Sequence, residues 1–206
     1  MKKRLMAVVI VVAGCMWSGA YDNALALPDP TEQLRPFVAQ IIQVLSDPGD
    51  DGAAESKVDR IMAVAQEGFD FREMSKRVLG RHWKEISPEE QEQFVELFTE
   101  LLKYAYVSQM ENYTNQKVEY GKQRIRGKRA QVQTVLVDGE RKIPVSYIML
   151  LRGEQWKVYD VVVEGVSLIR NYLEQFQEIL RKDDFKNLTQ QLKNKIVEFQ
   201  KSETVG

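Results

Sequence analysis

Residues Trp156–Tyr172, which read WKVYDVVVEGVSLIRNY, decide how this chain folds. The first half of the stretch is mostly β-branched or aromatic, which is typical of a strand buried on both faces. Glu164-Gly165 then interrupts the strand, and Ser167 stands where a side chain can cap the helix that follows. The stretch therefore predicts a last sheet strand that turns directly into a helix folded back over the sheet.

One carboxylate, Asp160, interrupts the apolar run of that strand. A buried carboxylate must be paired or hydrogen-bonded, because removing it from water is otherwise costly. We interpret Asp160, together with Gly165 and Ser167, as structural residues that hold the turn from strand to helix.

The hydrophobic period changes to two between residues 116 and 163, which predicts an antiparallel meander. Asp138-Gly139 is a strong hairpin signal, and Arg152-Gly153-Glu154 is a weaker one. The predicted strands are 117–126, 129–138, 141–151 and 155–163. One face of the third strand is predicted to carry Ile143, Val145, Tyr147, Met149 and Leu151.

Helices are predicted on both sides of the sheet in the sequence. The first begins at Pro36, after an irregular proline-rich segment at residues 27–35. Ser87 caps a later helix of about 24 residues, whose apolar stripe is wider than a surface helix needs. Two more helices, 167–181 and 184–200, end the chain. Helices packed on a curved four-stranded antiparallel sheet make an α+β fold.

Composition narrows the functional classes. Lys and Arg number 29 against 30 Asp and Glu, so no excess of positive charge favours nucleic acid. The only cysteine is Cys15 and the only histidine is His82, so neither a metal site nor a cofactor is predicted. The sequence has no nucleophile elbow, phosphate-binding glycine loop or HExxH motif. We therefore predict no catalytic residues.

The beginning of the chain predicts export. A basic start and a short apolar core precede Ala24-Leu25-Ala26, which is a typical cleavage site. Residues 1–26 are thus predicted to be a signal peptide. Residues 27–206 are predicted to form a single domain, with helical parts at 36–112 and 167–200 and a sheet part at 116–163. An alternative stays open, because residues 12–15 (VAGC) look like a lipobox, in which Cys15 would be acylated and tether the protein.

The segments Tyr159-Asp160-Val161 and Glu164–Ile169 resemble the signature of the MlaC family, also called the toluene-tolerance auxiliary family. Phe71–Gly80, Trp83 and the segment 87–91 (SPEEQ) look like the helix-loop-helix of that family. The resemblance covers roughly residues 30 to 200.

The resemblance implies a periplasmic carrier that holds phospholipid tails in an apolar pocket between a sheet and helices. The implied partners are diacyl phospholipid, an inner-membrane ABC transporter complex with an MCE-type subunit, and an outer-membrane lipoprotein–porin complex. Shuttling lipid between the two complexes would maintain the lipid asymmetry of the outer membrane. A membrane-tethered lipid-binding lipoprotein and a small-molecule enzyme on a cone-like fold stay open as alternatives, as does another apolar cargo such as a hopanoid.

An excess of apolar and aromatic side chains favours a hydrophobic cavity over a tightly packed small-residue core. The third strand and the long helix are predicted to line one cavity together. The residues predicted to line the pocket are Phe71, Met74, Phe94, Phe98, Leu101, Tyr104, Val145, Tyr147, Met149, Tyr159, Val161, Val166, Ile169 and Tyr172.

A basic run begins in the first predicted strand. Lys122, Arg124 and Arg126 alternate, so one strand face is predicted to carry all three. Such charges either keep an edge strand from aggregating or dock acidic membrane partners or lipid phosphates. Both interpretations stay open from the sequence.

Overall fold

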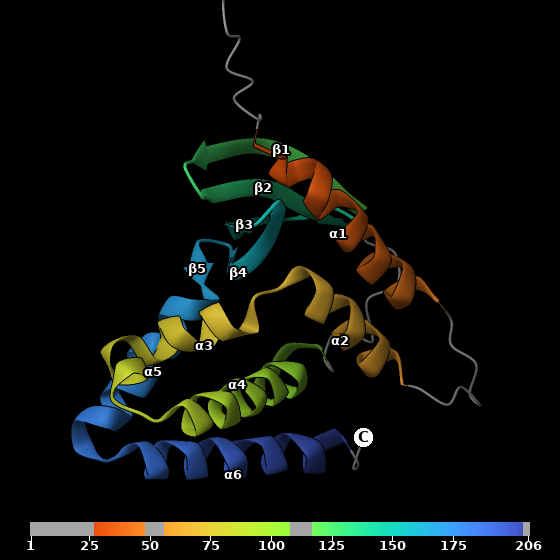
Figure 1. Ribbon diagram of the computed structural model, residues 1–206. Helices are drawn as coiled ribbons and strands as arrows, with labels where there is room; N and C mark the ends of the chain where they lie inside the picture. Colours follow the sequence, from red (N-terminus) through yellow and green to blue (C-terminus); the bar gives the residue numbers. More distant parts are fainter. Residues whose placement is uncertain (1–26, 48–55, 108–116, 204–206) are drawn as a thin grey trace, which may run out of the picture.

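The computed structural model describes residues 27–47, 56–107 and 117–203. Within these ranges, an open antiparallel sheet with the strand order β1-β2-β3-β4-β5 stands above a layer of helices (Figure 1). The predicted α+β class is confirmed, but the sheet has a fifth strand of two residues that was not predicted. The predicted signal peptide and Cys15 lie outside the described residues.

The helices are α1 (Pro30–Ser46), α2 (Lys57–Gly68), α3 (Phe71–Leu79), α4 (Pro88–Leu102), α5 (Leu168–Lys182) and α6 (Phe185–Glu203), with a 3-10 turn η1 (Gly80–Lys84) and a π-helical turn η2 (Lys103–Val107). The strands are β1 (Lys117–Arg126), β2 (Arg129–Asp138), β3 (Arg141–Arg152), β4 (Gln155–Val163) and β5 (Val166–Ser167). The first four strands lie within one residue of their predicted positions. A glycine with positive φ lies in the turn after each of β1, β2 and β3, where a tight hairpin needs that conformation.

Helix α1 begins at Pro30, so the prediction of a start at Pro36 was wrong. Asp29 caps the helix, because its Oδ1 accepts hydrogen bonds from the amides of Thr31 (2.8 Å) and Glu32 (3.0 Å). Pro30 takes the first helical turn, where a missing amide hydrogen costs nothing. Pro36 lies inside the helix with an exposed side chain.

Helix α4 begins at the predicted cap: the Glu90 amide donates to Ser87 Oγ (3.2 Å) and the Ser87 amide donates to Glu90 Oε2 (2.8 Å). It is shorter than predicted, ending at Leu102 after 15 residues and continuing as η2. The rest of the predicted helix lies outside the described residues. A π-turn inserts extra residues per turn, so a single α-helical period does not describe this segment.

Strand register divides the side chains of the sheet between two faces. The face that α1 covers is named the α1 face from here on, and its β3 residues are the five that were predicted to share a face. The α1 face carries Val118, Tyr120, Gln123 and Ile125 on β1; Ala130, Val132, Thr134 and Leu136 on β2; Ile143, Val145, Tyr147, Met149 and Leu151 on β3; and Trp156, Val158, Val161 and Val163 on β4. Register shifts in the β1–β2 and β3–β4 pairings add twist, which curves the sheet.

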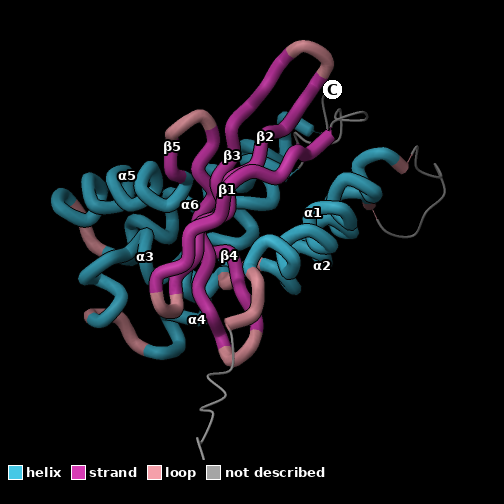
Figure 2. Tube along the Cα trace, turned by 90° about the horizontal axis from the view of Figure 1, so that it is seen from above, coloured by secondary structure: helices cyan, strands magenta, loops and turns pink. Residues whose placement is uncertain are grey.

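The two ends of the sheet differ in what lies beside them. In Figure 2 the β1–β2 and β3–β4 turns lie at one end, close to where α1 begins. The β2–β3 and β4–β5 turns lie at the other end. The two ends are named the α1 end and the far end below.

A buried carboxylate joins the sheet to the helical layer. Asp160 Oδ2 accepts a hydrogen bond from the Ser167 hydroxyl (2.6 Å), and Asp160 Oδ1 accepts one from the Ile169 amide (3.0 Å). Ser167 Oγ in turn accepts a hydrogen bond from the Arg170 amide at 3.0 Å, which caps α5. The intervening turn has positive φ at both Glu164 (51°) and Gly165 (86°), as a type I′ two-residue hairpin requires.

The link between α2 and α3 provides a second joint. Phe69 forms a parallel bridge with Val158, and the Asp70 amide donates to the Val158 carbonyl (2.8 Å). Arg152, at the end of β3, pairs with Asp70 (2.9 Å) and Glu73 (3.1 Å). This link covers the part of the β4 edge that the short strand β5 leaves open.

Replacing Asp160 tests the first joint. Asp160→Ala should lower the free energy of unfolding by about 1–3 kcal/mol, because two buried donors lose their acceptor. Asp160→Asn should lose less, since an amide oxygen still accepts from Ile169. Urea denaturation measures both variants. Glu174→Ala, an exposed change on α5, is the control and should stay within about 0.5 kcal/mol of the wild type. An Asp160→Ala variant as stable as this control would contradict the role of the joint.

Candidate functional site

Side-chain burial is uneven across the α1 face. Toward the α1 end, beneath the first turns of α1, the face is closed: Val132 is 0% and Met149 1% exposed. At the far end Val163 is 42% exposed, whereas Ile143 is 8% exposed. Beside the closed part and toward the far end lies a set of half-buried apolar side chains, which is Val118, Tyr120, Leu136, Val145, Tyr147 and Val161. The face is therefore closed beneath the first turns of α1 and incompletely covered over these six side chains.

The first turns of α1 seal the closed end. Leu34, Phe37 and Val38 pack against the sheet in one buried cluster. Polar contacts fix the helix there: Gln33 Oε1 accepts from the Trp156 amide (2.7 Å), and Trp156 Nε1 donates to the Pro28 carbonyl (2.6 Å).

The second half of α1 packs against α2. Val44 and Leu45 form a separate small cluster with Ile61 of α2. A β-carbon on Gly68 would lie 2.4 Å from the Phe37 ring, so only glycine allows the two helices to approach this closely. Ile41, Ile42 and Val64 pack half-buried against the cluster on the α1 face and extend the apolar surface from the helical side.

Tyr147 lies in the middle of the half-buried region. Burial raises the pKa of its phenol to about 12. The side chain is half-buried, so the protein leaves part of its surface uncovered. Burial also raises the pKa of Tyr120, its neighbour on the same face.

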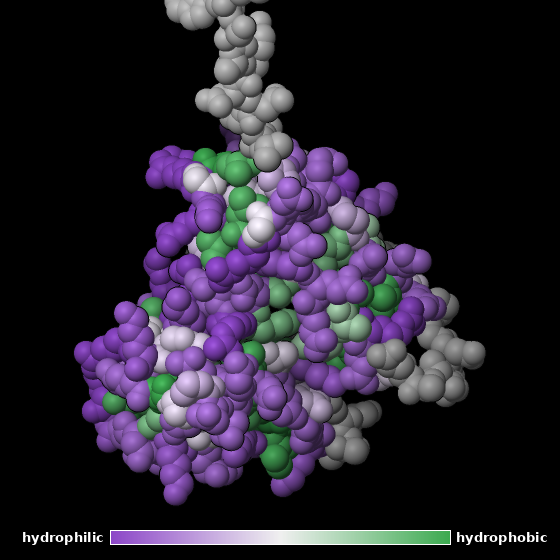
Figure 3. Space-filling view, viewed as in Figure 1, coloured by the Kyte–Doolittle hydropathy of each residue, from purple (hydrophilic) through white to green (hydrophobic). Residues whose placement is uncertain are grey.

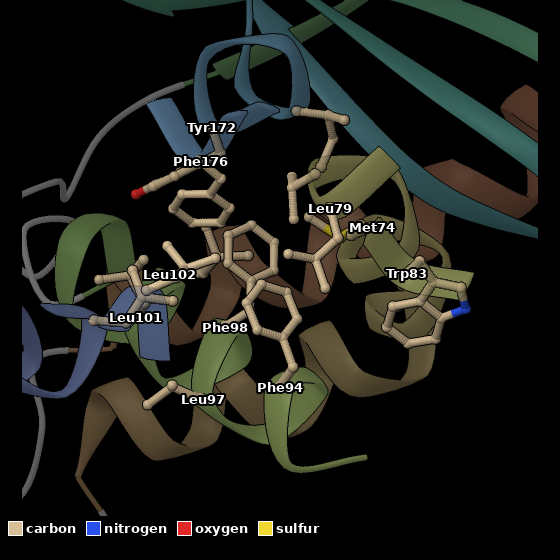
Figure 4. Close-up of a cluster of buried hydrophobic side chains, with 14 of the residues drawn as sticks. Met74, Leu79, Trp83, Phe94, Leu97, Phe98, Leu101, Leu102, Tyr172 and Phe176 are labelled. Carbon is tan, nitrogen blue, oxygen red and sulfur yellow. The ribbon is translucent and has the colours of Figure 1, made fainter. Parts of the chain in front are cut away.

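The aromatic stripe of α4 lies elsewhere, in a closed core (Figure 4). Phe94 and Phe98 are fully buried and stack with ring centroids 6.0 Å apart. Phe176 of α5 packs edge-on against both, and Tyr172 packs edge-on against Phe98. This core reaches the sheet through Ile148 and Leu150, which point away from the α1 face. No hollow is needed to accommodate these rings.

The structure thus divides the residues predicted to line one pocket. Four of them, Val145, Tyr147, Met149 and Val161, share the α1 face. The members found in or against the closed core are Phe71, Met74, Phe94, Phe98, Leu101, Tyr104, Tyr159, Ile169 and Tyr172. Val166 belongs to neither cluster and is 64% exposed. The third strand and the α4 stripe do not line one surface.

Sequence reasoning missed three of the six residues of the half-buried set, Val118, Tyr120 and Leu136, which come from β1 and β2. It also missed Ile41, Ile42 and Val64 of α1 and α2, which pack beside that set. The alternation of β1 and β2, followed across the hairpin, would have found the strand residues. The helical residues carry no such signal, because a helical period does not name the surface that it packs on.

A surface depression of about 410 Å³ lies outside both clusters. It lies between the β4–β5 turn and α5, and its lining includes Val166, Arg170 and Glu174. Polar and apolar groups are mixed in this depression. It lacks the continuous apolar lining of the α1 face.

The described residues contain no group of three or more His, Cys, Asp and Glu side chains placed to hold a metal ion. Both carboxylate oxygens of Asp160 are occupied by hydrogen bonds, and His82 Nδ1 lies 2.6 Å from Glu85 Oε2. In the same ranges, no helix combines the length and the apolar character that a membrane span needs.

A sequence model of the MlaC family, described as MlaC protein, matches residues 36–194. The chain belongs to the MlaC family. One relative, the intermembrane phospholipid transport system binding protein MlaC of Haemophilus influenzae, is 29% identical over 118 residues. That alignment covers 54% of this chain and spans 55% of the relative, about half of its length.

A solved structure extends the comparison of this MlaC-family chain to the fold. It is a phospholipid-binding protein of Ralstonia solanacearum in complex with a phospholipid. The two structures superpose with a TM-score of 0.74 at 21% identity, over 83% of this chain and 98% of the other. This likeness supports the α+β architecture described above.

The raised pKa of Tyr147 predicts a pH dependence of stability. Its phenol ionises near pH 10 when unfolded and at about 12 when folded, so the unfolded state loses this proton first. The contribution of Tyr147 is fully present below pH 10 and is lost as the pH rises toward 12. The free energy of unfolding of the wild type should therefore fall more steeply in this window than that of Tyr147→Phe. Urea denaturation at several pH values measures the free energy of unfolding of both proteins. If this free energy falls equally steeply with pH in the wild type and in Tyr147→Phe, the buried position of the phenol is contradicted.

Proposed function

We propose that this chain is a periplasmic carrier that holds the acyl tails of a phospholipid against the α1 face. The observation that carries the proposal is the set of half-buried apolar side chains around Tyr147, beside the part of the α1 face that α1 closes. Membership of the MlaC family supports it, as do a relative named for phospholipid transport and a structural neighbour solved with a phospholipid.

Physical chemistry explains why such a surface suits a carrier. Each methylene exposed to water costs about 0.8 kcal/mol, so a tail of about a dozen methylenes costs on the order of 10 kcal/mol. Free tails therefore do not cross an aqueous compartment at a useful rate. Apolar side chains of the sheet, α1 and α2 can shield the tails, while the far end leaves room for a polar head group.

On the face shown in Figure 3, hydrophobic side chains reach the surface between the sheet and the helices that lie below it. Exposed apolar surface of this kind is typical of a site that binds a lipid or a protein partner.

We extend the proposal to the two membranes. The chain would exchange lipid with an inner-membrane ABC transporter complex carrying an MCE-type subunit and with an outer-membrane lipoprotein–porin complex, which would maintain the asymmetry of the outer membrane.

Filling the half-buried part of the α1 face tests the proposal directly. Val145→Trp places an indole in the half-buried region of the α1 face, so it should lower the phospholipid that purifies with the protein several-fold. Gln133→Trp is the matched control, because Gln133 lies on the neighbouring strand, points to the opposite face and is exposed. Organic extraction followed by mass spectrometry measures the lipid per protein.

Three further results complete this test. Urea denaturation of Val145→Trp should show a loss no greater than about 1–3 kcal/mol, the usual cost of overpacking. Wild-type protein that contains no lipid would overturn the proposal. So would equal lipid in both tryptophan variants.

The mature N-terminus decides between a free and a tethered carrier. We expect the intact mass of the exported protein to correspond to a chain that begins at Leu27, since Ala24-Leu25-Ala26 precedes it. A mass that corresponds to an acylated Cys15 would exclude free diffusion and establish the tethered form instead.

A further inference from the structure

The segment 122–129, which spans the end of β1, the turn and the start of β2, carries five cations and no acid. The cations are Lys122, Arg124, Arg126, Lys128 and Arg129, and all five are exposed. The whole chain has a formal charge of −1, so this concentration of positive charge is strongly asymmetric. The segment is named the basic tip from here on.

The basic tip projects into open space at the α1 end of the sheet. A β-carbon added to Gly127 would meet no atom within 4 Å. Among the ion pairs of the described residues, none involves Arg126, Lys128 or Arg129. Their charges are therefore available to a partner outside the chain.

Protection of an edge strand does not account for this arrangement. β1 is the edge of the sheet, and a few charges along it would prevent pairing with another chain. The positive charge continues past the edge, however, through Lys128 in the turn to Arg129 on β2, which is an inner strand. A partner that contacts the end of the hairpin explains charges on both strands.

Two exposed aliphatic side chains accompany the cations. Ile125 is 38% exposed and belongs to the α1 face, whereas its sequence neighbours Arg124 and Arg126 belong to the opposite face of β1. Leu27 is 48% exposed, just before the cap of α1. In Figure 3 the end of the sheet where β1 meets β2 shows hydrophobic patches among hydrophilic ones. Cations interspersed with aliphatic side chains are typical of segments that lie on an anionic bilayer.

A hydrogen-bonded clamp holds the basic tip against α1. Thr31 Oγ1 donates to Gln123 Oε1 (2.6 Å), and Gln123 Nε2 donates to Asp29 Oδ2 (2.8 Å). The pKa of the Asp29 carboxyl is lowered, mainly because Gln123 donates this hydrogen bond to it. The tip and the first turn of α1 therefore form one rigid surface, so binding there orders little additional chain.

We propose that the basic tip, with Ile125 and Leu27, binds the surface of a bilayer that contains anionic phospholipid. A bilayer suits the site better than an acidic protein, because the end of one hairpin is too small for the roughly 800 Å² per partner of a stable interface. Binding at the α1 end would leave the far end of the α1 face free to exchange cargo. The basic tip, Ile125 and Leu27 all lie outside the half-buried set that the proposed function uses.

Vesicle binding tests the inference on protein made from the full chain and purified after export. The probes are phosphatidylcholine vesicles with and without phosphatidylglycerol, and flotation measures the bound fraction. Wild type should bind the anionic vesicles much more strongly at low salt, and the difference should shrink at high salt. An acyl group on the protein would raise binding to both vesicles equally, so the difference between them remains informative.

Matched charge changes make the test specific. Arg126→Glu with Lys128→Glu should weaken binding to the anionic vesicles about tenfold or more. Lys186→Glu with Lys193→Glu, on exposed positions of α6, changes the net charge equally and should have a much smaller effect. Ile125→Ser should weaken binding without changing its salt dependence. Extracted lipid should be unchanged in all these variants, which separates this proposal from that of the carrier.

Three outcomes would overturn the inference. The first is wild-type protein that does not prefer anionic vesicles at low salt, which would leave an acidic protein as the partner. The second is an equal loss of binding to anionic vesicles in the tip variant and the α6 variant, which would show that only the net charge of the protein matters. The third is a tip variant that binds as the wild type does.

Discussion

The rest of the structure depends on one buried carboxylate that ties the sheet to the helices. Asp160 lies in β4, yet its two oxygens accept hydrogen bonds from Ser167, which caps α5, and from Ile169 in the first turn of α5. The chain must therefore reverse within the few residues after β4, and α5 leaves the sheet in one direction only. Because α5 carries Tyr172 and Phe176 into the closed core, this joint sets where that core lies relative to the sheet. The α1 face is then left for α1 and α2 to cover.

This arrangement separates the groups that stabilise the fold from those that could hold a cargo. Phe94, Phe98 and Phe176 contact one another and leave no accessible surface to spare. Tyr147 and Val161 have partners on only part of their surface. Apolar side chains in the first group stabilise the fold through their full burial whether or not a ligand is present. Side chains in the second group are fully buried, and gain the corresponding free energy, only when a ligand or partner covers them.

The sequence predicted most of the sheet and part of the site, and the difference has a physical cause. Strand alternation is a local property, so the order of residues alone places Val145, Tyr147 and Met149 on one face. The wide stripe around Phe94 and Phe98 correctly indicated burial on several sides. A helical period does not say which surface receives the stripe, however, and the choice between the two faces of the sheet rests on the reversal at Asp160. For α1, the start was predicted at Pro36 because proline favours the first turn of a helix. The residues that begin the helix are the cap Asp29 and the proline that follows it, Pro30.

Helix α1 is attached to different partners at its two ends. At the closed end, Gln33 of α1 bonds to the backbone of Glu154 in the β3–β4 turn and of Trp156 in β4, and Gln123 of β1 bonds to the cap of α1. These contacts hold α1 to β1 and β4 by directional bonds. Nearer the far end, α1 meets α2 through the apolar side chains Val44, Leu45 and Ile61. Polar contacts reinforce this packing, because Lys57 Nζ donates to the Leu45 carbonyl (3.3 Å) and Arg60 pairs with Asp47 (2.8 Å). Helix α1 is therefore fixed to the sheet at its start and to α2 at its end, so it spans the α1 face between two polar attachments.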